Sequence, residues 1–240
     1  IQGVDPALFH PAEPRGYLKS RFVIFSGGKL EFRKGQDIVV EAVKRFRVRH
    51  PETLLISLWS SPMVRGYFVK LLDRSPHHPR MLDHVGETGI DWPALIQSVG
   101  LTNDGVRIFE MTENWILPQI MREADVALFP NRCEGGTNMM AMQAMACGVP
   151  CVLSANSGHL DIIEDGACIP LVAQRPVILD APEISTEGWG ESDVDEVVAA
   201  LEVIYQDRQK ARAIGDAGAD LMARYTWQAQ IHQLASMIGL

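Results

Sequence analysis

Short apolar runs alternate along this chain with longer segments in which apolar residues recur every three or four positions. A continuous apolar run of about four to eight residues is typical of a strand buried on both faces, and the wider spacing is typical of an amphipathic helix. Strands are predicted at 22–25, 53–59, 106–109, 126–130 and 151–154. Helices are predicted at 38–46, 91–99, 116–124, 138–146, 194–205, 208–223 and 227–238, with a short one near 67–72.

This alternation predicts an α/β fold, a doubly wound parallel sheet with helices on both faces. Ligands of such sheets bind beyond the carboxyl ends of the strands, so candidate binding residues should directly follow strands. Two segments, 60–90 and 173–191, contain prolines and show little periodicity. They are predicted to be irregular connections.

Composition and charge exclude several classes of protein. With 240 residues and 47% hydrophobic content the chain can bury the core of one compact domain. The net charge is −8 and the charges are dispersed, so a nucleic-acid partner is not expected. No apolar run approaches the roughly 18 to 20 residues of a membrane span. The four cysteines lack C-x-x-C spacing, which predicts a reducing, cytoplasmic setting without disulfides or zinc.

The first glycine-containing segment after a predicted strand runs from 26 to 35 and leads into a helix. It contains Gly27 and Gly28, which permit a tight turn, and the cations Lys29 and Lys34. Backbone amides and cations beside a helix N-terminus are suited to phosphate. The segment is neither G-x-G-x-x-G nor a P-loop, and a plain turn with solvated cations is the alternative interpretation.

A second such segment, 130–138, lies between a predicted strand and a predicted helix. Its amides could bind an anion, whereas the carboxylate of Glu134 would repel phosphate and is better suited to accept hydrogen bonds from sugar hydroxyls. The candidate binding residues here are Glu134, Gly135, Gly136, Thr137 and Asn138. Nine residues after Glu134, the amide of Gln143 could reach ribose hydroxyls, although by itself Gln143 is typical of a surface residue.

Other polar patterns in the sequence are attributed to local structure and not to the binding of a ligand. Asp193 and Asp195 imitate a D-x-D metal motif but stand where a helix begins, which favours helix capping. His77 and His78 lie in a proline-containing loop without the spacing of a metal site. No metal is therefore predicted. Trp189, between two glycines, is expected to be exposed, with or without a partner.

These motifs occur in an order that resembles the group 1 (GT4-type) retaining glycosyltransferases over most of the chain. The resemblance rests on Gly-Val-Asp at 3–5, the turn at 27–35, Ala-Asp-Val at 124–126 and the run from Glu134 to Pro150. It implies the C-terminal, donor-binding domain of a Rossmann-like GT-B fold. Residues 1–15 would be an interdomain linker, 16–225 the nucleotide-sugar donor domain and 226–240 a helix returning to an absent N-terminal acceptor domain.

The resemblance also implies a role for each candidate. Lys29 and Lys34 match the basic pair that neutralises the donor diphosphate, Glu134 matches the first glutamate of the Glu-x7-Glu motif and Gln143 the second. The spacing here is one residue longer, an amide replaces the second carboxylate, and Lys29 stands where the family usually has arginine. Lys29, Lys34 and Glu134 are therefore the expected catalytic residues, and segment 109–114 is a candidate for contacts with the base.

The implied reaction transfers a sugar from a nucleotide-diphosphate donor to an acceptor hydroxyl, with no cofactor beyond that donor substrate. This fragment alone is expected to be inactive. A non-catalytic nucleotide- or sugar-binding module and an epimerase-like enzyme are the alternatives, and the second lacks identifiable acid and base residues. Association with a membrane surface stays open, because acceptors are often lipid-linked, although the chain has no basic amphipathic face.

Overall fold

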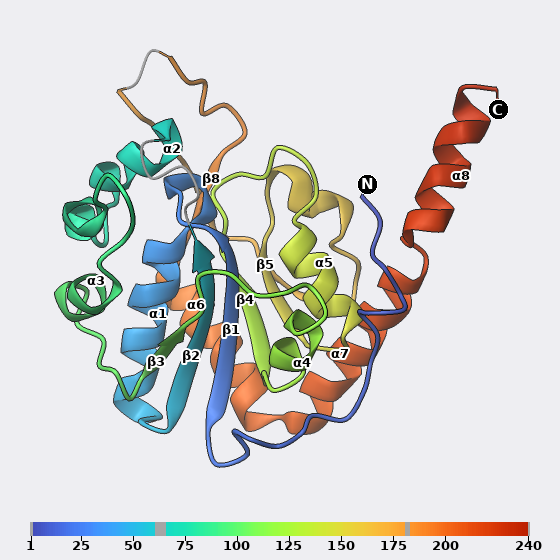
Figure 1. The fold of residues 1–240 in the computed structure, drawn as a ribbon, viewed down its shortest axis with the longest axis horizontal. Coiled ribbons are helices and arrows are strands. Elements are labelled where there is room, and N and C mark those ends of the chain that lie inside the picture. The colour runs from blue at the N-terminus through green and yellow to red at the C-terminus, as the bar shows by residue number, and fades with distance from the viewer. Residues whose placement is uncertain (1, 61–65, 181–182, 240) are drawn as a thin grey trace.

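The computed structural model describes residues 2–60, 66–180 and 183–239, and it is built around one parallel sheet (Figure 1). The order is β3-β2-β1-β4-β5-β6, so the strand order reverses between β1 and β4. The strands are β1 (Phe22–Lys29), β2 (Thr53–Ser60), β3 (Val106–Ile108), β4 (Val126–Phe129), β5 (Cys151–Ser154) and β6 (Ile169–Leu171). This order is that of a doubly wound sheet, and it confirms the predicted fold class.

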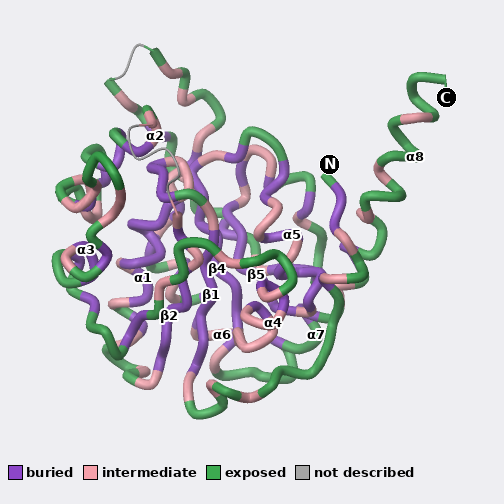
Figure 2. Tube along the Cα trace, viewed as in Figure 1, coloured by how far each residue is buried: buried purple, intermediate pink, exposed green. Residues whose placement is uncertain are grey.

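Helices cover both faces of the sheet. One face carries α1 (Gln36–Arg49), α3 (Trp92–Ser98) and α6 (Val194–Gln206), and the other carries α4 (Leu117–Met121) and α5 (Met139–Ala146). The helix α7 (Arg208–Ala223) contacts both apolar clusters. Successive residues of β1 point to opposite faces, Ile24 into one cluster and Phe25 into the other. The unbroken apolar run of the sequence therefore reflects burial on both sides, visible as the purple centre of Figure 2.

The structure differs from the prediction at three places in the sheets. The turn predicted at 26–28 is strand, because β1 continues to Lys29, which pairs with Ser60 of β2. A Cβ added at Gly27 would lie 2.3 Å from Cε of Met140, so the flexible end of that side chain would have to move to accommodate it. The short strand β6 was not predicted, because its three residues include Pro170. The hairpin of β7 (Gln174–Pro176) and β8 (Gly190–Ser192) was also missed within 173–191.

The connection after β2 contains short helical turns. The predicted short helix is present as α2 (Tyr67–Lys70) and the 3₁₀ helix η2 (Leu71–Arg74), and a further 3₁₀ helix, η3 (Pro79–His84), follows. Residues 61–65 of the predicted irregular segment lie outside the described residues. Figure 1 shows α2 beside the loop that joins β7 to β8, at the same end of the molecule.

The two end segments of the chain lie together. Val4 forms a parallel bridge with Thr226, and its N–H donates to the carbonyl of Tyr225 at 2.8 Å. After this bridge, α8 (Trp227–Met237) extends away from the sheet and has no buried residue (Figures 1 and 2). None of the helices in the described part of the chain is long and apolar enough to cross a bilayer.

Candidate functional site

The loops that follow β1 and β4 meet at the carboxyl edge of the sheet, where the strand order reverses. The N–H groups of Arg132 and Cys133 both donate to the carbonyl of Arg33, at 2.8 and 3.1 Å. Gly35, in the left-handed conformation at φ +67°, lies so close to the second loop that an added Cβ would be 2.3 Å from the carbonyl oxygen of Pro130. The two segments singled out in the sequence therefore form one site, at the usual ligand position of a doubly wound sheet.

The basic residues of the first loop differ in how far they are buried and in whether they contact the second loop. The 3₁₀ helix η1 (Phe32–Lys34) lies between β1 and α1. It turns Arg33 and Lys34 toward the second loop, with only 19% and 12% of their side chains exposed. Lys29, at the end of β1, is exposed and forms no ion pair with a described residue. Lys34 and Arg33 therefore contact Glu134, whereas Lys29 lies at the edge of the site without such a contact.

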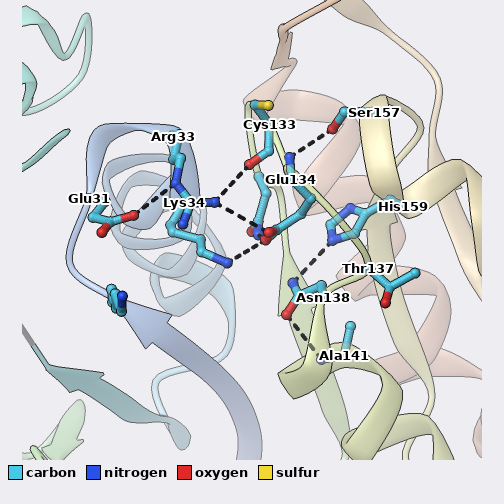
Figure 3. Close-up of polar contacts among 12 residues, drawn as sticks. Glu31, Arg33, Lys34, Cys133, Glu134, Thr137, Asn138, Ala141, Ser157 and His159 are labelled. Atoms are coloured by element: carbon cyan, nitrogen blue, oxygen red, sulfur yellow. Dashed lines mark hydrogen bonds and ion pairs between the residues drawn. The ribbon is translucent and has the colours of Figure 1, made fainter. Parts of the chain in front are cut away.

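Glu134 is the centre of an ion-pair cluster (Figure 3). One carboxylate oxygen lies 2.5 Å from Nζ of Lys34 and accepts from Asn131, and the other lies 3.3 Å from a guanidinium nitrogen of Arg33. Arg33 also pairs with Glu31 at 2.8 Å. Burial lowers the pKa of Lys34, as does Arg33, while Glu134 opposes this. The carboxylate that was predicted to accept from hydroxyls is therefore occupied by cations in this structure.

A buried histidine supports the second loop. His159, on the 3₁₀ helix η4 (Ser157–Asp161), is fully buried and lies with Nε2 3.1 Å from the side-chain nitrogen of Asn138. Its Nδ1 lies 3.1 Å from the carbonyl oxygen of Ser154, which can only accept, so Nδ1 carries the proton and Nε2 accepts from Asn138. Burial lowers the pKa of His159 to about 4, against the opposing charge of Glu134. Asn138 also caps α5, accepting from the N–H of Ala141, so one side chain joins the helix to the histidine.

The glycines of the second loop are free of internal constraint. A Cβ added to Gly135 or Gly136 would meet nothing within 4 Å, and neither has a positive φ. Thr137 is nearly buried, and its hydroxyl accepts from the N–H of Gln2 at 3.3 Å. Gln143, in the second turn of α5, is partly exposed and its amide makes no hydrogen bond with a described residue. Space above Gly135 and Gly136 is therefore available to a ligand.

Gly158 fixes the position of this loop from behind. A Cβ at Gly158 would lie 1.7 Å from the carbonyl oxygen of Gly136, which is backbone and cannot rotate away. We expect Gly158→Ala to lower the free energy of unfolding by about 1 to 3 kcal/mol, because the loop has to shift. Urea denaturation measures this loss. Gly89→Ala, at an open position without a positive φ, is the control and should match the wild type; equal stability of the two variants would show that the loop yields freely.

Arg132, like Arg33 and His159, was not predicted from the sequence as a residue of this region. It is fully buried and binds Asp37 at 2.7 and 2.8 Å, Glu191 at 2.9 Å and the carbonyl of Phe32 at 2.7 Å. Burial alone would raise the pKa of Asp37, but the charge and hydrogen bonds of Arg132 outweigh it and hold this pKa at about 2. The residue joins α1, the second loop and the hairpin. Its position directly after a buried strand was the available signal.

The discounted motifs have structural roles. Asp193 caps α6 by accepting from the N–H groups of Asp195 and Glu196, which confirms the predicted cap. His77 lies 3.1 Å from Glu191, and His78 lies 3.4 Å from Glu41. Within the described ranges, no group of three or more potential ligands stands close enough to hold a metal ion.

The fold is that of the Rossmann-like domains of GT-B glycosyltransferases, as a comparison with solved structures shows. It matches the C-terminal domain of the glycosyl transferase group 1 family protein LpcC from Francisella tularensis with a TM-score of 0.65 and 17% identity, covering 93% of this chain and 99% of that one. It matches Anabaena HepE, solved in complex with UDP-glucose, with a TM-score of 0.70 and 18% identity, covering 99% of this chain and 56% of that one.

The family model described as "Family 4 Glycosyltransferase in conflict systems" matches residues 105–234, and the chain belongs to this family. Among curated relatives, a GDP-mannose-dependent alpha-(1-6)-phosphatidylinositol monomannoside mannosyltransferase of Mycolicibacterium smegmatis is 24% identical over 251 residues. That match covers 99% of this chain and 54% of the relative. The chain thus spans about half the length of this relative.

Proposed function

We propose that this chain is the donor-binding half of a retaining glycosyltransferase, which transfers a sugar from a nucleotide-diphosphate sugar to an acceptor hydroxyl. The observation that carries the proposal is the meeting of Lys34 and Arg33 with Glu134 at the switch point of the sheet. Cations are suited to the diphosphate, and a carboxylate is suited to sugar hydroxyls. The open glycines Gly135 and Gly136 leave their amides accessible to a ligand.

In this proposal the role of each residue follows from the charge of its side chain. As the bond between sugar and phosphate breaks, negative charge gathers on the departing nucleoside diphosphate. Lys34 and Lys29 would stabilise that charge, and a well-placed donor contributes about 3 kcal/mol to such a transition state. In this proposal Glu134 holds the sugar, the amides of Gly136, Thr137 and Asn138 approach the phosphates, and Gln143 reaches the ribose. Gly27 and Gly28 shape the end of β1 beneath the phosphates.

Three observations support a half-protein rather than a complete enzyme. The mannosyltransferase relative is about twice as long, the HepE structure holds UDP-glucose in a chain of which this one covers 56%, and LpcC shows the same fold as a C-terminal domain. We assign 1–15 to a linker, 16–225 to the donor domain and 226–240 to a helix that contacts an acceptor domain. A cytoplasmic setting fits the four cysteines, all of which are free thiols.

Calorimetric titration with UDP, GDP and ADP tests the proposal. One diphosphate is expected to bind saturably, and Lys34→Ala should weaken it at least about tenfold, since a hydrogen bond to a charged group contributes about 1.5 to 3 kcal/mol. Lys19→Ala removes an exposed lysine before β1 and should leave the affinity unchanged. Equal affinity of the Lys34→Ala variant, or no binding by any of the three nucleotides, would contradict the proposal.

A further inference from the structure

A cavity lies beside the candidate donor site, between the loop after β5 and the hairpin of β7 and β8. Its volume is about 440 Å³, within the range of small-molecule pockets. Its lining includes the indole ring of Trp189, the uncharged polar side chains of Asn156, Gln174 and Thr186, and the carboxylate of Glu187. None of these residues belongs to the ion-pair cluster of the donor site.

Trp189 forms one wall of this cavity and packs against a neighbouring ring. Its ring lies against that of Phe68 on α2, with centroids 6.2 Å apart and planes inclined by 31°. The backbone closes a turn beneath it, because the N–H of Trp189 donates to the carbonyl of Thr186 at 3.0 Å. The hydroxyl of Tyr67 donates to Glu183 at 3.1 Å and ties α2 to the same loop. Trp189 is half-buried, and its indole N–H forms no hydrogen bond with a described residue, so it can donate to a ligand.

The chemistry of the lining suits an uncharged polyhydroxylated ligand. An aromatic ring offers an apolar face for the C–H groups of a pyranose, and the indole N–H is a donor. The side chains of Thr186 and Glu187 form no hydrogen bond with another described side chain and can bind hydroxyl groups. The one cation of the lining, Arg175, is paired with Asp193 at 2.9 Å, so an anionic ligand is not favoured.

Hydrogen bonds join the cavity directly to the donor loop. The N–H of Glu134 donates to Oγ of Ser157 at 2.8 Å, and that hydroxyl donates to the side-chain oxygen of Asn156 at 2.8 Å. The amide nitrogen of Asn156 donates in turn to the carbonyl of Gly190 at 3.3 Å. The N–H of Gly190 donates to the carbonyl of Arg132 at 3.0 Å. A sugar in the cavity would therefore stand next to the residues assigned to the donor.

We propose that the cavity around Trp189 is a saccharide subsite that holds part of a glycan acceptor beside the bound donor. The assignment of the bound saccharide as an acceptor rests on the proposed glycosyltransferase function. The binding of a saccharide at Trp189 does not depend on that function. The subsite would give the donor half a share in choosing the acceptor.

Saturation-transfer NMR on the whole chain tests the subsite, with methyl α-D-glucopyranoside and methyl α-D-mannopyranoside as probes titrated through the millimolar range. At least one glycoside is expected to bind saturably, Trp189→Ala to abolish the signal, and Trp189→Phe to retain part of it. Trp115→Ala, which removes an exposed tryptophan elsewhere, should bind as the wild type does.

Lys34→Ala separates the two sites. It is expected to bind nucleotide at least about tenfold more weakly and to retain the glycoside, whereas Trp189→Ala should retain the full affinity for nucleotide. Saccharide binding that survives in Trp189→Ala but is lost in Lys34→Ala would place the sugar in the donor site and overturn the subsite. Absence of saturable binding by both glycosides would overturn it as well. Absence of nucleotide binding alone would contradict only the proposed function.

Discussion

Replacement of Arg132 by leucine is expected to lower the free energy of unfolding by about 3 to 5 kcal/mol. The arginine is fully buried between Asp37 and Glu191, and its guanidinium also lies 4.0 Å from the ring centroid of Phe32. Leucine would leave the buried carboxylate of Asp37 with the hydroxyl of Ser75 as its remaining strong partner. An uncompensated buried charge costs far more than the lost attraction of an exposed pair.

Urea denaturation at pH 7 measures this loss, and Arg45→Leu is the matched control. Arg45 pairs with Glu41 and Asp195, but 45% of its side chain is exposed, so its removal should cost at most about 1 kcal/mol. The double variant Arg132→Met with Asp37→Leu removes both charges and should recover part of the stability. A loss in Arg132→Leu no larger than that in Arg45→Leu would mean that the network contributes little.

The stability of the wild type is expected to fall by roughly 3 kcal/mol between pH 7 and pH 4 through His159 alone. The pKa of His159 is about 4 in the folded chain and its ordinary value is 6.5, so the unfolded chain binds a proton more readily in this window. The contribution is therefore fully present above pH 6.5 and is lost as the pH falls toward 4. Asp37, with a pKa of about 2, loses its contribution only at lower pH.

Unfolding free energies of the wild type and His159→Gln, measured at several values between pH 7 and pH 4, isolate this term. The variant should show a shallower dependence on pH, whatever its stability at pH 7. His232→Gln removes an exposed histidine of α8 and should keep the wild-type slope. Parallel curves for the wild type and His159→Gln would show that the ring is not held neutral in the fold.

The sheet could be predicted from the sequence because its strands are buried on both faces. Ile24 and Val126, for example, lie in unbroken apolar runs bounded by polar residues, a pattern typical of such strands. The three-residue strands β6, β7 and β8 carry no such signal, whereas the equally short β3 lies in the predicted run 106–109. Arg175 in β7 and Glu191 in β8 are charged, as residues of a loop commonly are. The two segments are strands because they pair with each other, although they are far apart in the chain.

The candidate site was predictable in its location and less so in its contacts. Lys34 and Glu134 each follow a strand, and adjacency of those strands brings them together. The sequence could not show that Arg33 shares the carboxylate, because η1 had not been predicted and sets the direction of that side chain. Nor could it show that Arg132 turns inward, since arginine is commonly exposed and its burial depends on carboxylates from α1 and β8.

The short contact between Lys34 and Glu134 affects the entropy cost of binding a ligand. A free lysine carries about 2 kcal/mol of rotamer entropy, and here that freedom is already lost on folding, because the carboxylate holds the ammonium in place. A phosphate that takes over this ammonium meets a side chain that needs little further ordering. The same exchange of partner frees one oxygen of the Glu134 carboxylate from Lys34, while Arg33 and Asn131 still bind the carboxylate. Recognition of the phosphate and recognition of the sugar would then be thermodynamically coupled, each strengthening the other.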